Sequence, residues 1–110
     1  MPLTGLKVLD FGRYIAGPYC AALLADYGAD VIRVEAPDGN DDRYTVPVAA
    51  DGSGAMFLQM NRNKRCLTLK PGTPEGREIV RRLVARADVV IATLPHDALL
   101  KLGLDFDSLS

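Results

Sequence analysis

The stretch from Leu6 to Glu35 constrains the fold of this 110-residue chain more than any other part of it. Residues 6–10 are mostly aliphatic and predict a short buried strand, after which residues 11–17 form a glycine-containing loop. Pro18 suits the first position of a helix, and the apolar residues 19–27 predict a helix that is buried on most of its circumference.

Gly28 is expected to end this helix in the left-handed conformation, and residues 31–35 predict a second strand. A single helix that joins two such strands is typical of a right-handed crossover between parallel strands. The stretch therefore predicts an α/β protein with a parallel sheet.

A second crossover unit follows later in the chain. Thr73-Pro74-Glu75 combines a capping hydroxyl, a proline and an acid, which together predict the start of an amphipathic helix. Residues 88–92 then read as a buried strand. Between the two units, residues 55–60 predict a short helical turn and residues 66–69 a strand.

The loop over residues 11–17 is the first candidate binding site. Ligands of open α/β sheets bind beyond the carboxyl ends of the strands, against helix N-termini. The N–H groups around Gly17, Tyr19 and Cys20 are expected to face an anion, and Arg13 adds a positive charge. The glycine spacing matches neither the dinucleotide fingerprint nor a P-loop. A ligand-binding loop and a plain tight turn are both open readings of these residues.

Charge and composition argue against some classes of binding partner and indicate a compartment. The formal net charge is -1 and there is no tryptophan, which argues against a nucleic acid or an anionic membrane surface as partner. Cys20 and Cys66 are expected to be core thiols in a reduced compartment, with a catalytic thiol at Cys20 as the alternative. No signal peptide or membrane-length apolar run is visible, so a cytoplasmic location is expected.

Three polar features have two readings each. Asp41 and Asp42, in the polar segment 36–54, allow a cation site, but a solvated loop is favoured. Residues 61–65 carry three cations and allow a phosphate-binding patch, but composition favours an exposed turn. His96 is expected to be a surface residue of a short helix that Gly103 ends, rather than a catalytic base.

The chain ends while its pattern is still developing. Phe106 and Leu109 look like the start of another amphipathic helix, and a doubly wound sheet would continue beyond them. We interpret residues 1–110 as one Rossmann-like segment, either the N-terminal part of a larger domain or a half-fold that pairs to cover its sheet.

Several sequence blocks occur in a recognisable order. They are residues 5–10, 16–18 and 24–35, then Asn61-x-Asn63-Lys64-Arg65, then Thr73-Pro74-Glu75-Gly76 and Ala87-Asp88-Val89, and last Leu102-Gly103-Leu104. Together they resemble the opening of the class III coenzyme A transferases, the relatives of formyl-CoA transferase, carnitine-CoA transferase and 2-methylacyl-CoA racemase. The resemblance covers essentially the whole chain.

The resemblance implies a Rossmann-like large domain, a small domain and two interlocked chains in a homodimer. It implies transfer of CoA between carboxylic acids, through anhydride and thioester intermediates on an aspartate and without a metal. That aspartate lies downstream of the matched region, so the 110 residues alone are expected to be inactive.

The resemblance also implies CoA contacts. In the first loop these are Ile15 and Ala16, with Arg13 at a position where some relatives carry a histidine near the active centre. The nucleotide end would meet Leu69, Lys70 and Gly72, the cofactor would run along Thr93, Leu94 and Pro95, and Lys101 would meet phosphate. Ala36 departs from the family, because some relatives have a phosphate-contacting arginine there.

Three alternatives stay open at this point. The first is the racemase branch, which uses acid–base chemistry at the α-carbon. The second is a truncated, non-catalytic subunit that only associates with a partner chain. The third is an ordinary dinucleotide- or S-adenosylmethionine-binding Rossmann protein, against which the missing third glycine argues.

Overall fold

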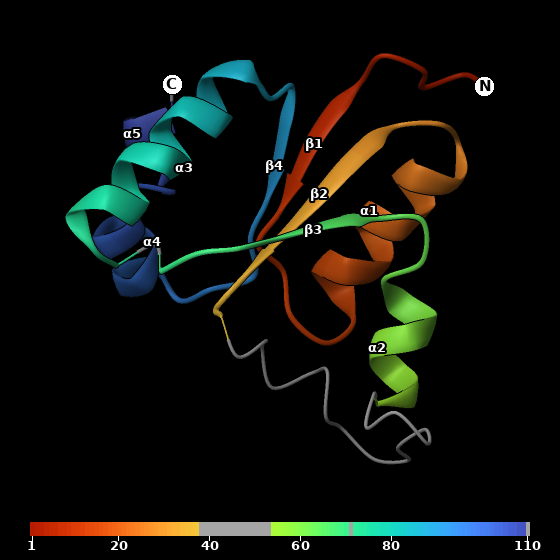
Figure 1. Cartoon of the computed structure of the whole chain (residues 1–110), viewed down its shortest axis with the longest axis horizontal. Coiled ribbons are helices and arrows are strands. Elements are labelled where there is room, and N and C mark those ends of the chain that lie inside the picture. Colours follow the sequence, from red (N-terminus) through yellow and green to blue (C-terminus); the bar gives the residue numbers. More distant parts are fainter. Residues whose placement is uncertain (38–53, 71, 110) are drawn as a thin grey trace.

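A computed structural model describes residues 1–37, 54–70 and 72–109 of the chain. In this part, four strands form one entirely parallel sheet in the order β3-β2-β1-β4 (Figure 1). The strands are β1 (Lys7–Asp10), β2 (Asp30–Glu35), β3 (Arg65–Thr68) and β4 (Val89–Ile91). All four strands predicted from the sequence are confirmed, with ends that differ by one residue.

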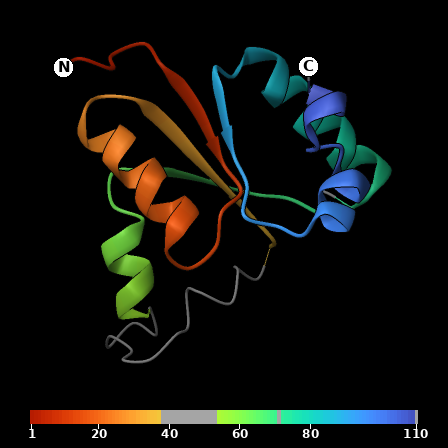
Figure 2. The same cartoon turned by 180° about the vertical axis from the view of Figure 1, so that it is seen from behind.

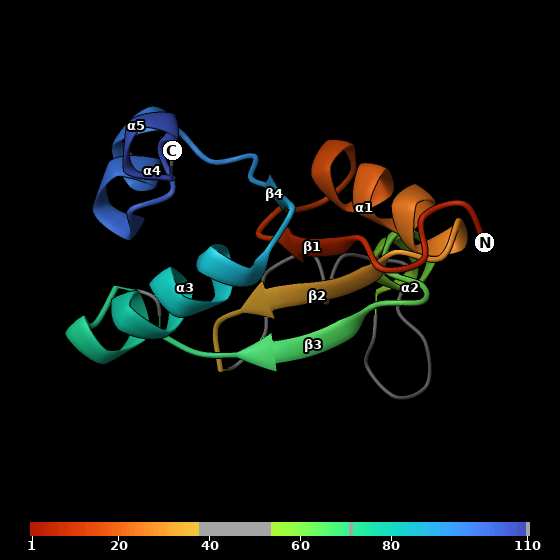
Figure 3. The same cartoon turned by 90° about the horizontal axis from the view of Figure 1, so that it is seen from above.

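Helices cover both faces of the sheet, as a Rossmann-like fold requires. The helices are α1 (Ala16–Asp26), α2 (Ala55–Met60), α3 (Pro74–Arg86), α4 (His96–Leu102) and α5 (Phe106–Leu109). Helices α1 and α2 lie on one side of the sheet, and α3, α4 and α5 lie on the other (Figures 1 and 2). The view from above shows the strands between these two groups (Figure 3).

The alternation of side chains along β1 and β2 divides the core in two. Val8 and Val31 point toward α1 and pack with its alanines. Leu9 and Val34 point to the opposite face and pack with Val80 of α3. Each strand therefore contributes to both layers, which is typical of a sheet covered on both sides.

Helix α1 differs from its prediction in two ways. It begins at Ala16, so Pro18 occupies its third position rather than its first. It is also buried on one face only, because Tyr19, Leu23 and Tyr27 are 45%, 38% and 56% exposed. The small residues of the helix face the sheet and the large ones face outward, which a count of apolar residues does not reveal.

The helix ends agree better with the sequence. Gly28 and Gly103 have φ values of 104° and 70°, so both adopt the expected left-handed conformation after α1 and α4. Thr73 caps α3 by accepting a hydrogen bond from the Gly76 N–H at 3.0 Å. His96 is an exposed residue at the start of α4, as predicted.

The prediction that both cysteines are core thiols is wrong. Cys20 and Cys66 are both exposed, and neither forms a disulfide. Cys20 lies on the outward face of α1, and Cys66 lies on β3, which is the edge strand of the sheet. An edge strand has a neighbour on one side only, so its side chains are covered less than those of β1 and β2.

Candidate functional site

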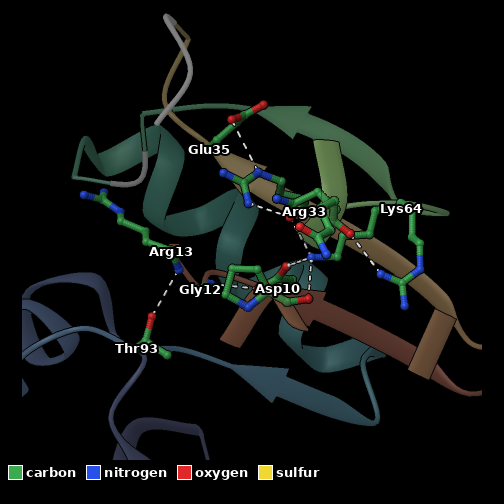
Figure 4. A network of polar contacts seen from close by, with 11 residues as sticks. Asp10, Gly12, Arg13, Arg33, Glu35, Lys64 and Thr93 are labelled. Carbon is green, nitrogen blue, oxygen red and sulfur yellow. Dashed lines mark hydrogen bonds and ion pairs between the residues drawn. The ribbon is translucent and has the colours of Figure 1, made fainter. Parts of the chain in front are cut away.

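The strand order places the candidate ligand site at the carboxyl ends of β1 and β4. These two neighbours lead to helices on opposite faces of the sheet, which makes this point the topological switch of the fold. The loop after β1 crosses to the end of β4, where the Phe11 N–H donates to the Ile91 carbonyl at 2.8 Å. The Arg13 N–H donates to Thr93 Oγ1 at 3.1 Å (Figure 4).

Two glycines allow this loop to pack closely. A Cβ added at Gly17 would lie 2.9 Å from Thr93 Cγ2 and 3.0 Å from the Gly12 Cα. A Cβ added at Gly12 would lie 2.9 Å from Asp10 Oδ1 and from Pro18 Cδ. Glycine is therefore required at both positions by close approach of the chain.

The first turn of α1 carries no side-chain cap and no acidic residue. The N–H groups without an acceptor inside the helix are those of Ile15, Ala16 and Gly17. Pro18, the next residue, has no backbone N–H. The expectation for Tyr19 is wrong, because its N–H donates to the Ile15 carbonyl at 2.8 Å. This follows from the earlier start of the helix, and it moves the anion-facing groups two to three residues upstream.

The same loop holds an unusual backbone conformation. Tyr14 has a φ of 64°, in the left-handed region that non-glycine residues rarely adopt. This backbone conformation lowers the stability of the fold by about 1–3 kcal/mol, and it persists where neighbouring contacts hold the residue in place. Residues in such conformations also concentrate at functional sites.

The predicted contact residues fall into two groups in space. Five of them surround the switch point: Arg13, Ile15 and Ala16 in or after the first loop, and Thr93 and Leu94 after β4. All except Leu94 are exposed. Pro95 follows them as the residue that precedes α4. Leu94 and Arg13 also line a cavity of about 110 Å³, together with Phe11, Val34, Glu35, Ala36 and Leu102.

The second group lies at the same carboxyl end of the strands, but beside β3, at the opposite edge of the sheet from β4. Leu69, Lys70 and Gly72 follow β3, which β2 separates from β1. The Leu69 side chain is 8% exposed and belongs to the hydrophobic core, so only its backbone can meet a ligand. Lys70 and Gly72 are exposed, and Lys101 is exposed in the last turn of α4.

Buried charged side chains lie beneath the first loop. Asp10 and Arg33 are both 0% exposed and Glu35 is 3% exposed, although they are strand residues with charged side chains. Lys64, from the turn before β3, is also buried, and its Nζ lies 2.7 Å from Asp10 Oδ2. Arg33 Nε lies 3.5 Å from Glu35 Oε2 (Figure 4).

Asn61 joins these two ion pairs. Its Oδ1 accepts hydrogen bonds from Lys64 Nζ at 2.6 Å and from Arg33 Nη1 at 2.7 Å. No buried side-chain nitrogen or oxygen in the described residues lacks a hydrogen-bond partner. Buried charges are tolerated under these conditions, when they are paired and fully hydrogen-bonded.

Sequence reasoning missed this network, although one signal was available. Asp10, Arg33 and Glu35 occupy the strand positions that alternate with Leu9 and Val34, so they point to the face that Val8 and Val31 share. Charged residues at positions that the pattern assigns to a covered face indicate buried pairs. The partners Asn61 and Lys64 could not be assigned from the sequence.

The structure confirms the exposed turn before a strand over residues 61–65, except that the Lys64 side chain is buried. Arg62 contacts Asp26 at 2.6 Å and Arg65 contacts Asp30 at 2.7 Å, while Lys64 is buried against Asp10. Each of the three cations has a carboxylate partner, which favours the turn over a phosphate-binding patch. The hydrogen bond from Arg62 lowers the pKa of Asp26 and raises that of Arg62.

The candidate cation site at Asp41 and Asp42 lies outside the described residues. Within them, no three His, Cys, Asp or Glu side chains gather closely enough to hold a metal ion. The part of the chain that the structure describes also has no helix of the length and apolarity that a membrane crossing requires.

A parallel sheet of order 3-2-1-4, with a glycine loop and an uncapped helix start at its switch point, defines a Rossmann-like protein whose candidate ligand site lies at that edge. The model of CoA-transferase family III matches residues 3–110. The chain therefore belongs to the class III CoA transferases, as its sequence blocks indicated.

Individual relatives agree with this assignment. The succinate–glutarate CoA-transferase of Agrobacterium fabrum is 47% identical over 98% of this chain and 29% of its own length. A CaiB/BaiF family protein from Brucella suis has a solved structure with a TM-score of 0.91 and 50% identity, over 99% of this chain and 30% of that one. A formyl-CoA:oxalate CoA-transferase of Escherichia coli is 36% identical over 96% of the chain and 26% of its own length. The chain thus spans about three tenths of the length of these relatives.

Proposed function

We propose that this chain is the CoA-binding N-terminal part of a transferase that moves CoA between carboxylic acids. In this proposal the thioester end of an acyl-CoA lies at the crevice between β1 and β4. The nucleotide end extends along the carboxyl edge of the sheet, past Leu69, Lys70 and Gly72. Lys101 meets a phosphate.

The observation that carries the proposal is the junction of the first loop with the end of β4. Residues 80 positions apart meet there, because the Arg13 N–H donates to Thr93 Oγ1. Both sides of that junction contain residues for which the family resemblance implies CoA contact. This is also the edge at which parallel α/β sheets bind ligands.

The chemistry of the site fits a thioester. The N–H groups at the start of α1 have no acidic side chain beside them, so they are suited to an oxygen that gains negative charge. Arg13 adds a formal positive charge at the same loop. In the proposed scheme this segment holds and polarises the thioester. The carboxylate of an aspartate outside residues 1–110 attacks the acyl carbon, the C–S bond breaks, and CoA leaves as the thiolate while the acyl group stays on the aspartate as an anhydride.

A dinucleotide is a poorer fit to the same crevice. Dinucleotide-binding Rossmann proteins use an acidic residue after the glycine loop to bind a ribose hydroxyl. Glu35 ends β2, as that acid would, but it is 3% exposed and lies 3.5 Å from Arg33 Nε. The ion pair therefore competes with any role for Glu35 in ribose binding.

The names of the relatives favour one class of acid. Proteins that are 47%, 43% and 41% identical to this chain act on succinate and glutarate, on succinyl-CoA and mesaconate, and on succinyl-CoA and L-malate. We therefore propose succinyl-CoA as donor and a four- or five-carbon dicarboxylate as acceptor. Homodimerisation, which the family resemblance implies, is part of the same proposal.

Two measurements test the function on the protein as it is naturally expressed. Isothermal titration with CoA should show binding, and incubation of succinyl-CoA with isotope-labelled glutarate should yield labelled glutaryl-CoA. Absence of CoA binding would overturn the proposal. Solvent deuterium at the α-carbon of an acyl-CoA, without exchange of acids, would favour the racemase branch instead.

Two variants of Thr93 test the contact between the first loop and the end of β4. Thr93→Val removes the oxygen that accepts the Arg13 N–H but keeps the shape of the side chain, and Thr93→Ser keeps the oxygen. Because a net hydrogen bond is worth about 0.5–1.5 kcal/mol, Thr93→Val should weaken CoA binding about two- to tenfold. Thr93→Ser should bind like the wild type. Equal affinity of all three proteins would contradict a role for this junction.

A further inference from the structure

Lys64 connects three segments at the base of the candidate site, and no step of the proposed reaction uses it. Its ammonium donates to Asp10 Oδ2 at the end of β1, to the Pro18 carbonyl in the first turn of α1, and to Asn61 Oδ1. The three distances are 2.7, 3.0 and 2.6 Å. The side chain of Lys64 is fully buried.

We propose that Lys64 is a positioning residue for the thioester, because its buried ammonium fixes both ends of the loop between β1 and α1. This inference rests on the proposed function and adds a residue to it. Lys64 itself lies beneath the loop and does not touch the ligand.

The contacts on either side of the loop explain why one residue can have this effect. Asp10 accepts from Lys64 with one oxygen and from the Gly12 N–H with the other, at 2.8 Å. The ammonium thus orients the carboxylate that shapes the turn after β1. Its second bond, to the Pro18 carbonyl, fixes the start of α1 relative to that turn.

The strained residue lies between these two anchors. Tyr14 has a φ of 64°, and such a conformation persists only where the surrounding contacts hold it. Loss of one anchor should let the loop relax, which displaces Arg13, Ile15 and Ala16 from the crevice. Binding and catalysis are sensitive to displacements of this size, because a shift of about 1 Å can cost about a hundredfold.

Simple removal of Lys64 would leave the Asp10 carboxylate buried without its partner. The test therefore uses the double variant Asp10→Asn, Lys64→Met, which is neutral and keeps an amide oxygen for the Gly12 N–H. Neutral replacement of a buried ion pair is often tolerated by the fold. The matched control is Arg65→Met, which removes the neighbouring cation from an exposed pair with Asp30 at the opposite ends of the strands.

The readouts are the Kd for CoA and the KM values for succinyl-CoA and for the acceptor acid, on the protein as it is naturally expressed. The double variant should raise the Kd and the succinyl-CoA KM about tenfold or more, with the acceptor KM unchanged. Arg65→Met should leave all three values unchanged. A purely structural role would instead lower the active fraction and leave both KM values at wild-type levels, which would overturn the inference.

The inference and the proposed function fail in different ways. If the wild type does not bind CoA, the function is wrong and the inference falls with it. If the wild type binds CoA and the double variant binds it equally well, Lys64 has no positioning role and the function stands. If the double variant does not fold, Asn61→Ala supplies the deciding measurement. It removes one acceptor of Lys64 and one of Arg33, and it retains the ion pairs of these residues with Asp10 and Glu35. It should raise the succinyl-CoA KM alone, and an unchanged KM would contradict the inference.

Discussion

Helices α1 and α3 both follow strands of the same sheet, but they begin in opposite ways. Helix α3 starts with residues that stabilise it locally: Thr73 caps the Gly76 N–H, and Glu75 places a negative charge in the first turn. Helix α1 has no side-chain cap and no acid in its first turn. Its start is fixed by residues distant in the sequence, of which Lys64 is 46 positions away from the carbonyl it binds.

The difference indicates which helix start is available to a ligand. At α3 the chain itself caps the Gly76 N–H and places Glu75 at the positive end of the helix dipole. At α1 the first turn has neither a side-chain cap nor an acidic residue, and the contacts of Lys64 hold the loop from beneath. A helix N-terminus that has no side-chain cap, and that buried contacts hold in place, is suited to bind an anionic ligand. The predictions that follow test this contrast, from the largest expected effect to the smallest.

The single substitution Lys64→Met should have the largest effect on stability. It leaves the fully buried carboxylate of Asp10 without a cation, which costs about 3–5 kcal/mol of unfolding free energy. Urea unfolding of the natural protein measures the loss. Arg62→Met serves as the control, because its pair with Asp26 is exposed and solvent screening leaves it little effect on stability. Equal losses in the two variants would show that burial does not distinguish the pairs.

Gly17→Ala should have the next largest effect. The added methyl group would lie 3.0 Å from the Gly12 Cα, and a backbone atom cannot move aside as a flexible side chain can. Such overpacking costs about 1–3 kcal/mol, and here it should also weaken CoA binding because it displaces the loop.

Gly72→Ala is the control for that steric effect, since no atom lies within 4 Å of a Cβ at Gly72. Its unfolding free energy should stay near that of the wild type. A stable Gly17→Ala protein with unchanged CoA affinity would contradict the close packing described for the loop.

The same contrast explains how much could be predicted from the sequence. The α3 start was predicted correctly, because its signals lie within four consecutive residues. The parallel strands and the flanking helices were likewise predicted from local patterns. The sequence pattern places the start of α1 two residues late, because proline is most favoured at the first helical position, whereas the real start depends on distant contacts.

The interior of the site could not be predicted in the same way. Asp10 and Lys64 are 54 positions apart, and Arg33 and Asn61 are 28 apart, so no local pattern pairs them. The strand order also arises from long-range pairing, and it is this order that brings Thr93 to the first loop. The family resemblance identified residues on both sides of the crevice, but the network beneath them became visible only with the structure.

Thr73→Ala should show that the start of α3 contributes more to stability than to CoA binding, in contrast to the start of α1. Loss of the capping hydroxyl costs about 1 kcal/mol of stability, which thermal unfolding can detect. The Kd for CoA should change less than in Gly17→Ala, because Thr73 reaches the proposed nucleotide end through its hydrogen bonds to the Lys70 carbonyl and does not contact the first loop. Thr73→Ser should restore the stability, since serine caps as well as threonine. A loss of CoA affinity in Thr73→Ala as large as that in Gly17→Ala would contradict this difference between the two helix starts.

The smallest effect is expected on the outer face of α3. Glu78 accepts hydrogen bonds from Arg81 at 2.7 Å and from Arg82 at 3.1 Å, and these bonds lower its pKa to about 2. A lowered carboxyl pKa means that the stabilisation is complete above the ordinary value of 4.5 and is lost as the pH falls through about 2. Carbon-13 NMR of the Glu78 side chain should follow this titration. Because the pairs are exposed, about 1 M salt should return the pKa of Glu78 toward 4.5, and the overall stability should change little.

The pH dependence of CoA binding between pH 4.5 and 7 should be the same in the wild type and in Glu78→Gln, since this charge cluster lies on the outer face of α3, away from the first loop. A difference between the two proteins would extend the site to α3.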